Sequence, residues 1–117
     1  MILELAGEEP SPVTAQGASY VTPGIPDWTT AQLKFPSGIQ AHLNISWMNP
    51  VKEQLLVVIG ETGTLIFEDS EAEWGKKLAY YRHTISRSED DGKPFPSRAD
   101  VEYITVPIDE PLKQECQ

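Results

Sequence analysis

The segment 39–47 alternates apolar and polar residues without a break. Its odd positions place Ile39, Ala41, Leu43, Ile45 and Trp47 on one side, and its even positions place Gln40, His42, Asn44 and Ser46 on the other. Side chains of a β-strand point alternately to the two faces of a sheet, so this pattern predicts a long strand with one apolar and one polar face. Such a strand is a scaffold or an interface, and it contains no recognisable catalytic motif.

More strands are predicted on both sides of this segment. The expected strands cover residues 13–21, 28–35, 39–47, 54–59, 64–68, 77–83 and 101–106. A three-residue turn at 36–38 joins two of them into a hairpin, and the glycines at the ends of 60–63 indicate a second tight turn. The predicted fold class is α+β, dominated by an open, mostly antiparallel sheet.

The length of 117 residues predicts a single domain over 1–117. Residues 86–98 are polar, contain the acidic run 89–91 and are interrupted by two prolines, which predicts a mobile loop. Both ends of the chain have helical character. Residues 2–7 resemble the last turn of a helix with Gly7 as its cap, and 109–116 resemble the first turn of another. We therefore expect a fragment of a longer protein.

Charge and composition exclude several classes of function. The net charge of −9 argues against nucleic acids and anionic membrane surfaces as partners, because both require clustered lysine and arginine. No apolar run approaches the ~20 residues of a membrane span. Cys116 is the single cysteine, so an internal disulfide and a thiolate zinc site are excluded. With no signal peptide visible at the start, the sequence predicts a cytoplasmic location.

No residue stands out as catalytic, cofactor-binding or metal-ligating. His42 and His83 are isolated histidines, and neither has a nucleophile at a recognisable spacing. No two glycines are separated by one residue, so the dinucleotide-binding fingerprint is absent. The tryptophans Trp28, Trp47 and Trp74 are able to stack on a sugar, although core or interface packing is the commoner role.

Three short motifs in a fixed order resemble one family of oxidoreductases. They are the turn Phe35-Pro36-Ser37-Gly38, the strand end Ser46-Trp47 and the stretch Gly60-Glu61-Thr62-Gly63-Thr64-Leu65, all following Asp27-Trp28. The pattern is similar to the C-terminal domain of the glucose–fructose oxidoreductase, inositol dehydrogenase and rhizopine-catabolism (Gfo/Idh/MocA) family. Within that family the chain is most similar to bacterial nucleotide-sugar dehydrogenases.

The resemblance implies that the chemistry lies outside this chain. Family members carry NAD or NADP on a Rossmann domain that precedes this one, and none of the family's catalytic residues maps onto a residue here. The chain alone should therefore bind no cofactor and be inactive. It would form the floor of a sugar or nucleotide-sugar pocket and a homo-oligomer interface, with Gln40, His42, Asn44 and Ser46 on the contacting face and with apolar area left exposed.

Two other interpretations remain open at this point. A free-standing β-sheet module that binds carbohydrate or protein through its tryptophans predicts sugar binding without a cofactor and a core that needs no partner. An intact enzyme predicts turnover by the isolated chain.

Overall fold

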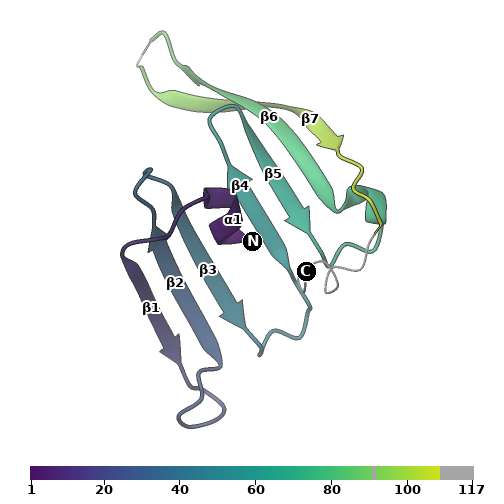
Figure 1. Cartoon of the computed structure of the whole chain (residues 1–117). Helices are drawn as coiled ribbons and strands as arrows, with labels where there is room; N and C mark the ends of the chain where they lie inside the picture. Colours follow the sequence, from purple (N-terminus) through teal and green to yellow (C-terminus); the bar gives the residue numbers. More distant parts are fainter. Residues whose placement is uncertain (91, 109–117) are drawn as a thin grey trace. The chain divides into compact units, whose positions relative to one another are not determined.

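The chain folds into two compact units, Met1–Val51 and Lys52–Gln117, each built around its own antiparallel sheet (Figure 1). The computed structural model describes residues 1–90 and 92–108. Antiparallel strands with one short α-helix confirm the fold class expected from the sequence. The division into two units differs from the single domain expected over 1–117. The helix start expected at 109–116 lies outside the described residues.

The first unit is a helical turn followed by a three-stranded meander. Its elements are α1 (Ile2–Ala6), β1 (Val13–Ala18), β2 (Trp28–Lys34) and β3 (Gln40–Ser46), with the strands in the order β1-β2-β3. The helix ends as its sequence predicts, because Gly7 has φ 69° and donates its N–H to the Leu3 carbonyl at 2.8 Å. The strands at 28–35 and 39–47 are confirmed to within one residue.

The turn between β2 and β3 is fixed by Phe35 and Gly38. The Phe35 side chain is 4% exposed, and its backbone N–H donates to the Ile39 carbonyl at 2.9 Å. Gly38 adopts φ 94°, which a side chain would strain, and its N–H donates to the Phe35 carbonyl at 2.9 Å. The three-residue spacing of phenylalanine and glycine in this motif therefore follows from one hydrogen-bonded turn, which needs a buried ring at its start and a positive φ at its end.

The second unit is a four-stranded meander. Its elements are β4 (Leu55–Ile59), β5 (Gly63–Glu68), the 3₁₀ turn η1 (Trp74–Lys76), β6 (Leu78–Arg87) and β7 (Pro94–Tyr103), in the strand order β4-β5-β6-β7. The tight turn expected at 60–63 is confirmed, since Gly60 donates its N–H to the Gly63 carbonyl at 2.9 Å. His83 supports this turn from β6, with Nε2 3.1 Å from the Gly60 carbonyl and Nδ1 3.3 Å from the Thr64 hydroxyl.

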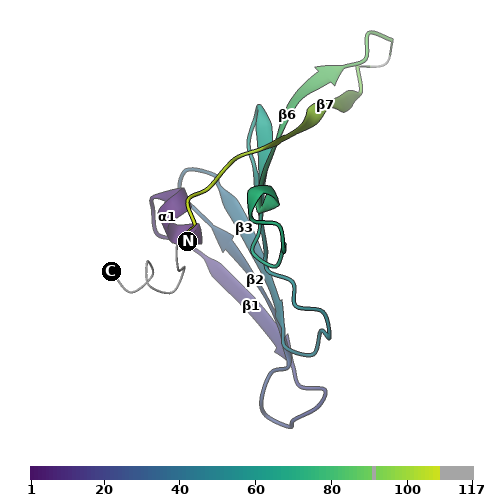
Figure 2. The ribbon, with the colours of Figure 1, turned by 90° about the vertical axis from the view of Figure 1, so that its right-hand side faces the viewer.

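The prediction of a loop over 86–98 is wrong for most of this segment. β6 continues to Arg87 and β7 begins at Pro94, so the two strands form a hairpin there. Ser86 pairs with Phe95, and the turn closes where Ser88 donates its N–H to the Lys93 carbonyl at 2.9 Å. Pro94 is tolerated because β7 is an edge strand, where a missing N–H need not break a ladder. β5 pairs only with the first half of β6, so the far half of the hairpin runs beyond β5 (Figure 1; Figure 2).

A buried lysine stabilises the connection between β5 and β6. The Lys77 ammonium lies 3.2 Å from the Asp69 carboxylate and 5.4 Å from the centre of the Trp74 ring. The Trp74 indole in turn donates to the Val106 carbonyl at 3.0 Å. Trp74 is therefore used within its own unit to join η1 to the segment that follows β7.

Little apolar surface is buried in the part of the chain that the structure describes. Phe35 and Ala79 are the only buried hydrophobic residues there. Both faces of the second sheet are apolar yet still open, with Leu55 and Val57 on one face and Val58 on the other. A sheet becomes stable when another layer covers its apolar face, so both units expose surface that suits a further layer.

The described helices are all too short and too polar to cross a bilayer.

Candidate functional site

One face of the three-stranded sheet is polar and almost free of charge. Antiparallel partners share a face, and the register aligns Thr14, Gln32 and His42 in one row and Gln16, Thr30 and Asn44 in the next. The whole face, called here the polar face, comprises Thr14, Gln16, Ala18, Trp28, Thr30, Gln32, Lys34, Gln40, His42, Asn44 and Ser46. Within these three fully described strands, Lys34 at the edge of the polar face is its one permanent charge.

The opposite face of the same sheet is apolar. It carries Val13, Ala15, Gly17, Thr29, Ala31, Leu33, Ala41, Leu43 and Ile45. The two faces therefore separate as the alternation in 39–47 predicts, and the four residues expected to share a face, Gln40, His42, Asn44 and Ser46, do share it. Their role in a subunit interface stays a prediction.

Some side chains of the polar face are fixed by hydrogen bonds and others are free. The Trp28 indole donates to the Asn44 amide oxygen at 2.7 Å, and the Thr30 hydroxyl donates to the Leu43 carbonyl at 3.0 Å. Among the residues that the structure describes, Gln32 and His42 have no side-chain hydrogen bond, although they lie opposite one another. The centre of the polar face thus offers unpaired donors and acceptors to a ligand or a partner.

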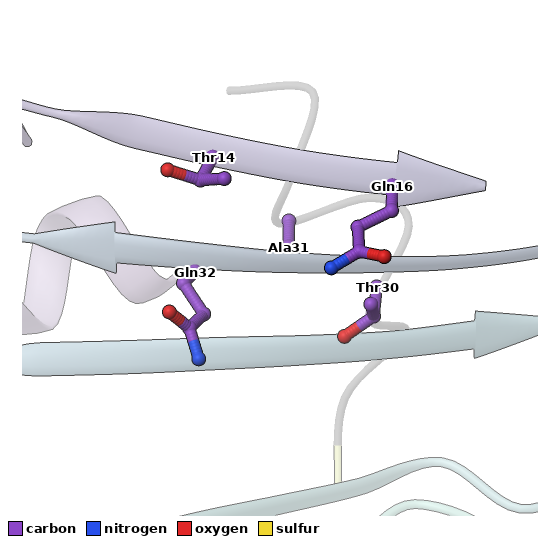
Figure 3. Close-up of a pocket in the computed structure, with 5 residues that line it drawn as sticks. All are labelled: Thr14, Gln16, Thr30, Ala31 and Gln32. Atoms are coloured by element: carbon purple, nitrogen blue, oxygen red, sulfur yellow. The ribbon is translucent and has the colours of Figure 1, made fainter.

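A shallow hollow of about 110 Å³ lies between β1 and β2 on this sheet (Figure 3). It is lined by Thr14, Gln16, Thr30, Ala31 and Gln32. Pockets that enclose a small-molecule ligand usually measure ~300–1,000 Å³ and are lined largely by apolar and aromatic groups. This hollow is smaller, open and without an aromatic ring, so it is better suited to receive part of another surface than to enclose a substrate.

The buried acid Asp27 organises the end of the sheet where the polar face stops. Its carboxyl group is 1% exposed, and Oδ2 accepts the backbone N–H groups of Tyr20 at 2.5 Å and Val21 at 2.6 Å. Its own N–H donates to the Ala18 carbonyl at 2.8 Å, and its carbonyl accepts the Ser46 hydroxyl at 3.2 Å. Asp27 therefore ties the loop 19–26 to both β1 and β3.

Asp27 precedes the three family-like motifs in the sequence, and its role is not predicted by them. A local signal was present, because an aspartate that follows a Pro-Gly-Ile-Pro turn and precedes a strand is a common acceptor for turn amides. The two N–H groups that Asp27 accepts lie six and seven residues earlier in the chain. Which amides they are depends on the path of the loop, so the sequence spacing does not predict them.

The other candidates do not converge on a site. His42 and Trp28 belong to the polar face, whereas His83 and Trp74 serve the internal contacts of the second unit. In the described part of the chain, no group of three or more histidine, cysteine or acidic side chains is arranged to hold a metal ion. Outside the polar face, the hydrogen bond to the Glu73 carboxylate raises the pKa of the exposed Lys76 ammonium.

Comparison with known proteins identifies a family for this chain. Residues 1–66 match the family model described as the GFO/IDH/MocA C-terminal domain, which covers more than half of the chain and includes all three motifs. No curated protein and no solved structure gives a significant match. The matched segment contains the whole polar face and the Gly60–Gly63 turn.

Proposed function

Because this chain belongs to the GFO/IDH/MocA oxidoreductase family through that C-terminal domain, we propose that it forms the non-catalytic, sheet-bearing part of an NAD(P)-dependent sugar or nucleotide-sugar oxidoreductase. In this proposal the cofactor and the groups that move hydride and proton are supplied outside these residues, in a cytoplasmic enzyme. The chain contributes the floor of the substrate pocket and a sheet through which two copies associate.

The absence of charge across the centre of the polar face supports the subunit interface. A two-fold interface brings the same patch of two copies together, so a charged patch would repel its own copy. Amide and hydroxyl side chains carry both donors and acceptors and can therefore pair with themselves. Gln16, Gln32, Gln40 and Asn44 have this property, in a chain whose net charge is −9.

The scarcity of charged side chains on the polar face also lowers the free-energy cost of removing this face from water when two copies associate. Burying an ionised group without a partner costs far more than burying an amide that finds a hydrogen bond. The cores of protein interfaces are accordingly poor in charged residues. A solvated face of a sheet has no such restriction, and the second sheet illustrates this with the exposed residues Arg82 and Glu102.

We expect the chain to form a dimer in the micromolar range, and Gln32→Arg to raise its dissociation constant at least about tenfold. The substitution brings a guanidinium and its symmetry copy into an interface that offers no described acid. Sedimentation velocity over a concentration series measures the effect. Gln54→Arg, which makes the same change at an exposed position of the other unit, is the matched control and should leave the constant unchanged. A wild-type chain that is monomeric throughout contradicts the proposal.

The same face supports a second candidate, a free-standing carbohydrate- or protein-binding module. The observation in its favour is Trp28, which lies beside Asn44 and Thr30 on a surface rich in amides and hydroxyls. This module predicts a monomer whose tryptophan emission saturates with added saccharide. The interface predicts emission that depends on protein concentration and not on saccharide, so one titration separates the two functions.

A further inference from the structure

The polar face alone is too small to hold a stable dimer. Its strands contain six or seven residues each, and strands ~4.8 Å apart with a rise of ~3.3 Å per residue cover only about 300 Å² in projection. Stable interfaces bury about 800 Å² on each partner, so even twice this projected area falls short. The interface must therefore extend onto neighbouring surface.

Affinity also requires groups that the polar face mostly lacks. Interface energy is concentrated in a few well-packed residues, commonly aromatic ones, while surrounding polar contacts contribute complementarity. Trp28 is the one aromatic residue of the fully described strands β1–β3, and it is already half-buried. We therefore expect further apolar side chains that contribute to affinity in the segments next to the ends of these strands.

The loop 19–26 is the surface that continues directly from the end of the polar face. It joins Ala18 of β1 to Asp27 and Trp28, and it exposes three large apolar side chains. The exposed fractions are 71% for Tyr20, 63% for Val21 and 58% for Ile25. An exposed aromatic side chain of this size contributes on the order of 100 Å² when it is covered.

Hydrogen bonds within the first unit also tie this loop to the end of the sheet. Asp27 accepts the N–H groups of Tyr20 and Val21, and Ile25 donates its N–H to the Thr22 carbonyl at 3.2 Å. Gly24 turns the chain at φ 82°. Ordering a loop on binding weakens affinity, so a preformed apolar loop suits an interface better than a mobile one.

We propose that Tyr20, Val21 and Ile25 are the apolar anchors of an interface with a second copy of this chain, in which the polar face supplies the complementary centre. This inference rests on the proposed function, because it assumes that two copies meet through the polar face. A second copy is the expected occupant, because the loop continues from the face that the proposed dimer uses and that face alone covers less area than a stable dimer needs. The loop contributes affinity, and the polar face sets which surfaces can pair.

The test is the dimer dissociation constant of the double variant Tyr20→Ser/Ile25→Ser, measured by sedimentation velocity on the full chain. Removing two anchors should raise the constant at least about thirtyfold. Ile108→Ser is the matched control, since Ile108 is 83% exposed and belongs to the other unit. All substituted positions are exposed, and unchanged far-ultraviolet circular dichroism verifies that each variant is folded.

The outcomes separate the loop from the face. A weakened dimer in the double variant, with Ile108→Ser unchanged, supports the anchors. A double variant that dimerises like the wild type while Gln32→Arg does not overturns the anchors and leaves the polar-face interface standing. An equal loss in Ile108→Ser also overturns them, because it indicates unspecific association. A wild-type monomer, or a dimer that resists both changes, overturns the interface and the anchors together.

Discussion

Replacing Asp27 by alanine should lower the free energy of unfolding of the first unit by about 3 kcal/mol. The change removes the acceptor of two backbone N–H groups, those of Tyr20 and Val21. Hydrogen bonds to a charged group contribute about 1.5–3 kcal/mol each, and part of the loss is recovered when water reaches the freed amides. A unit whose one buried apolar side chain among the described residues is Phe35 has little reserve against such a loss.

Urea denaturation followed by tryptophan emission measures this effect in a Trp74→Phe background, where Trp28 and Trp47 report on the first unit. Asp27→Asn is the control, because its amide oxygen can still accept both N–H groups without the full charge. We expect its loss to be about half that of alanine. Amide exchange gives a residue-specific readout, with the Tyr20 and Val21 amides losing protection. Equal stability of the alanine variant and the wild type would contradict the structural role.

Replacing Gly63 by alanine should lower the free energy of unfolding of the second unit by about 2 kcal/mol. A Cβ placed on Gly63 would lie 2.6 Å from the Tyr80 hydroxyl oxygen and 2.7 Å from the ring carbon that carries it. Because these distances are well inside van der Waals contact, the ring or the strand must shift, and overpacking of this kind costs ~1–3 kcal/mol. The second glycine of the Gly-x-x-Gly-x-Leu motif thus lies against the tip of the Tyr80 ring, which a larger residue would have to displace.

Two companions make this prediction specific. Gly75→Ala places its Cβ in open space and should leave stability nearly unchanged. Tyr80→Ala removes the ring, so Gly63→Ala should cost much less in that background than in the wild type. Urea titrations in a Trp28→Phe/Trp47→Phe background, where Trp74 alone reports, complete the double-mutant cycle. Additive losses would show that the ring is not the reason for the glycine.

The strands of the first unit could be predicted from the sequence because two signals agree there. Period-two alternation gives the face of every residue in β3, and the Phe35–Gly38 turn fixes which residues of β2 lie opposite. When the face of each β3 residue and the register between β2 and β3 are known, the residues of β2 that belong to the polar face can be assigned. The strand expected at 13–21 ends at Ala18, and beyond it the N–H groups of Tyr20 and Val21 donate to Asp27 instead of to a neighbouring strand.

The second unit was harder to predict because its local signals disagree with its pairing. Acidic and proline residues in 86–98 favour a loop, yet backbone pairing to β6 extends β7 from Pro94 onward. The position of a strand at a sheet edge decides whether proline is tolerated, and that position is a property of the whole sheet. The alternation of apolar and polar residues describes one strand at a time. It therefore does not predict that the strands divide into two sheets.

For the candidate site, the sequence predicted the residues of the polar face on β3 and missed the groups that frame it. Gln40, His42, Asn44 and Ser46 follow from alternation alone. The contribution of Gln16 and Gln32 depends on register, and that of Asp27 depends on a contact across a loop. Contacts between residues distant in the sequence are set by the fold, so single-sequence reasoning does not reach them.

The scarcity of buried apolar side chains has a consequence for the thermodynamics of unfolding. An ordinary domain of 117 residues unfolds with a heat-capacity increase of about 1.5 kcal/mol/K, which arises from newly hydrated apolar surface. In the described part of this chain only Phe35 and Ala79 are buried apolar residues, so much of that surface is already hydrated in the folded monomer. Calorimetry of a dilute sample should give a smaller increase and a broad transition. At higher concentration association covers the surface, and both the heat-capacity increase and the Tm should rise.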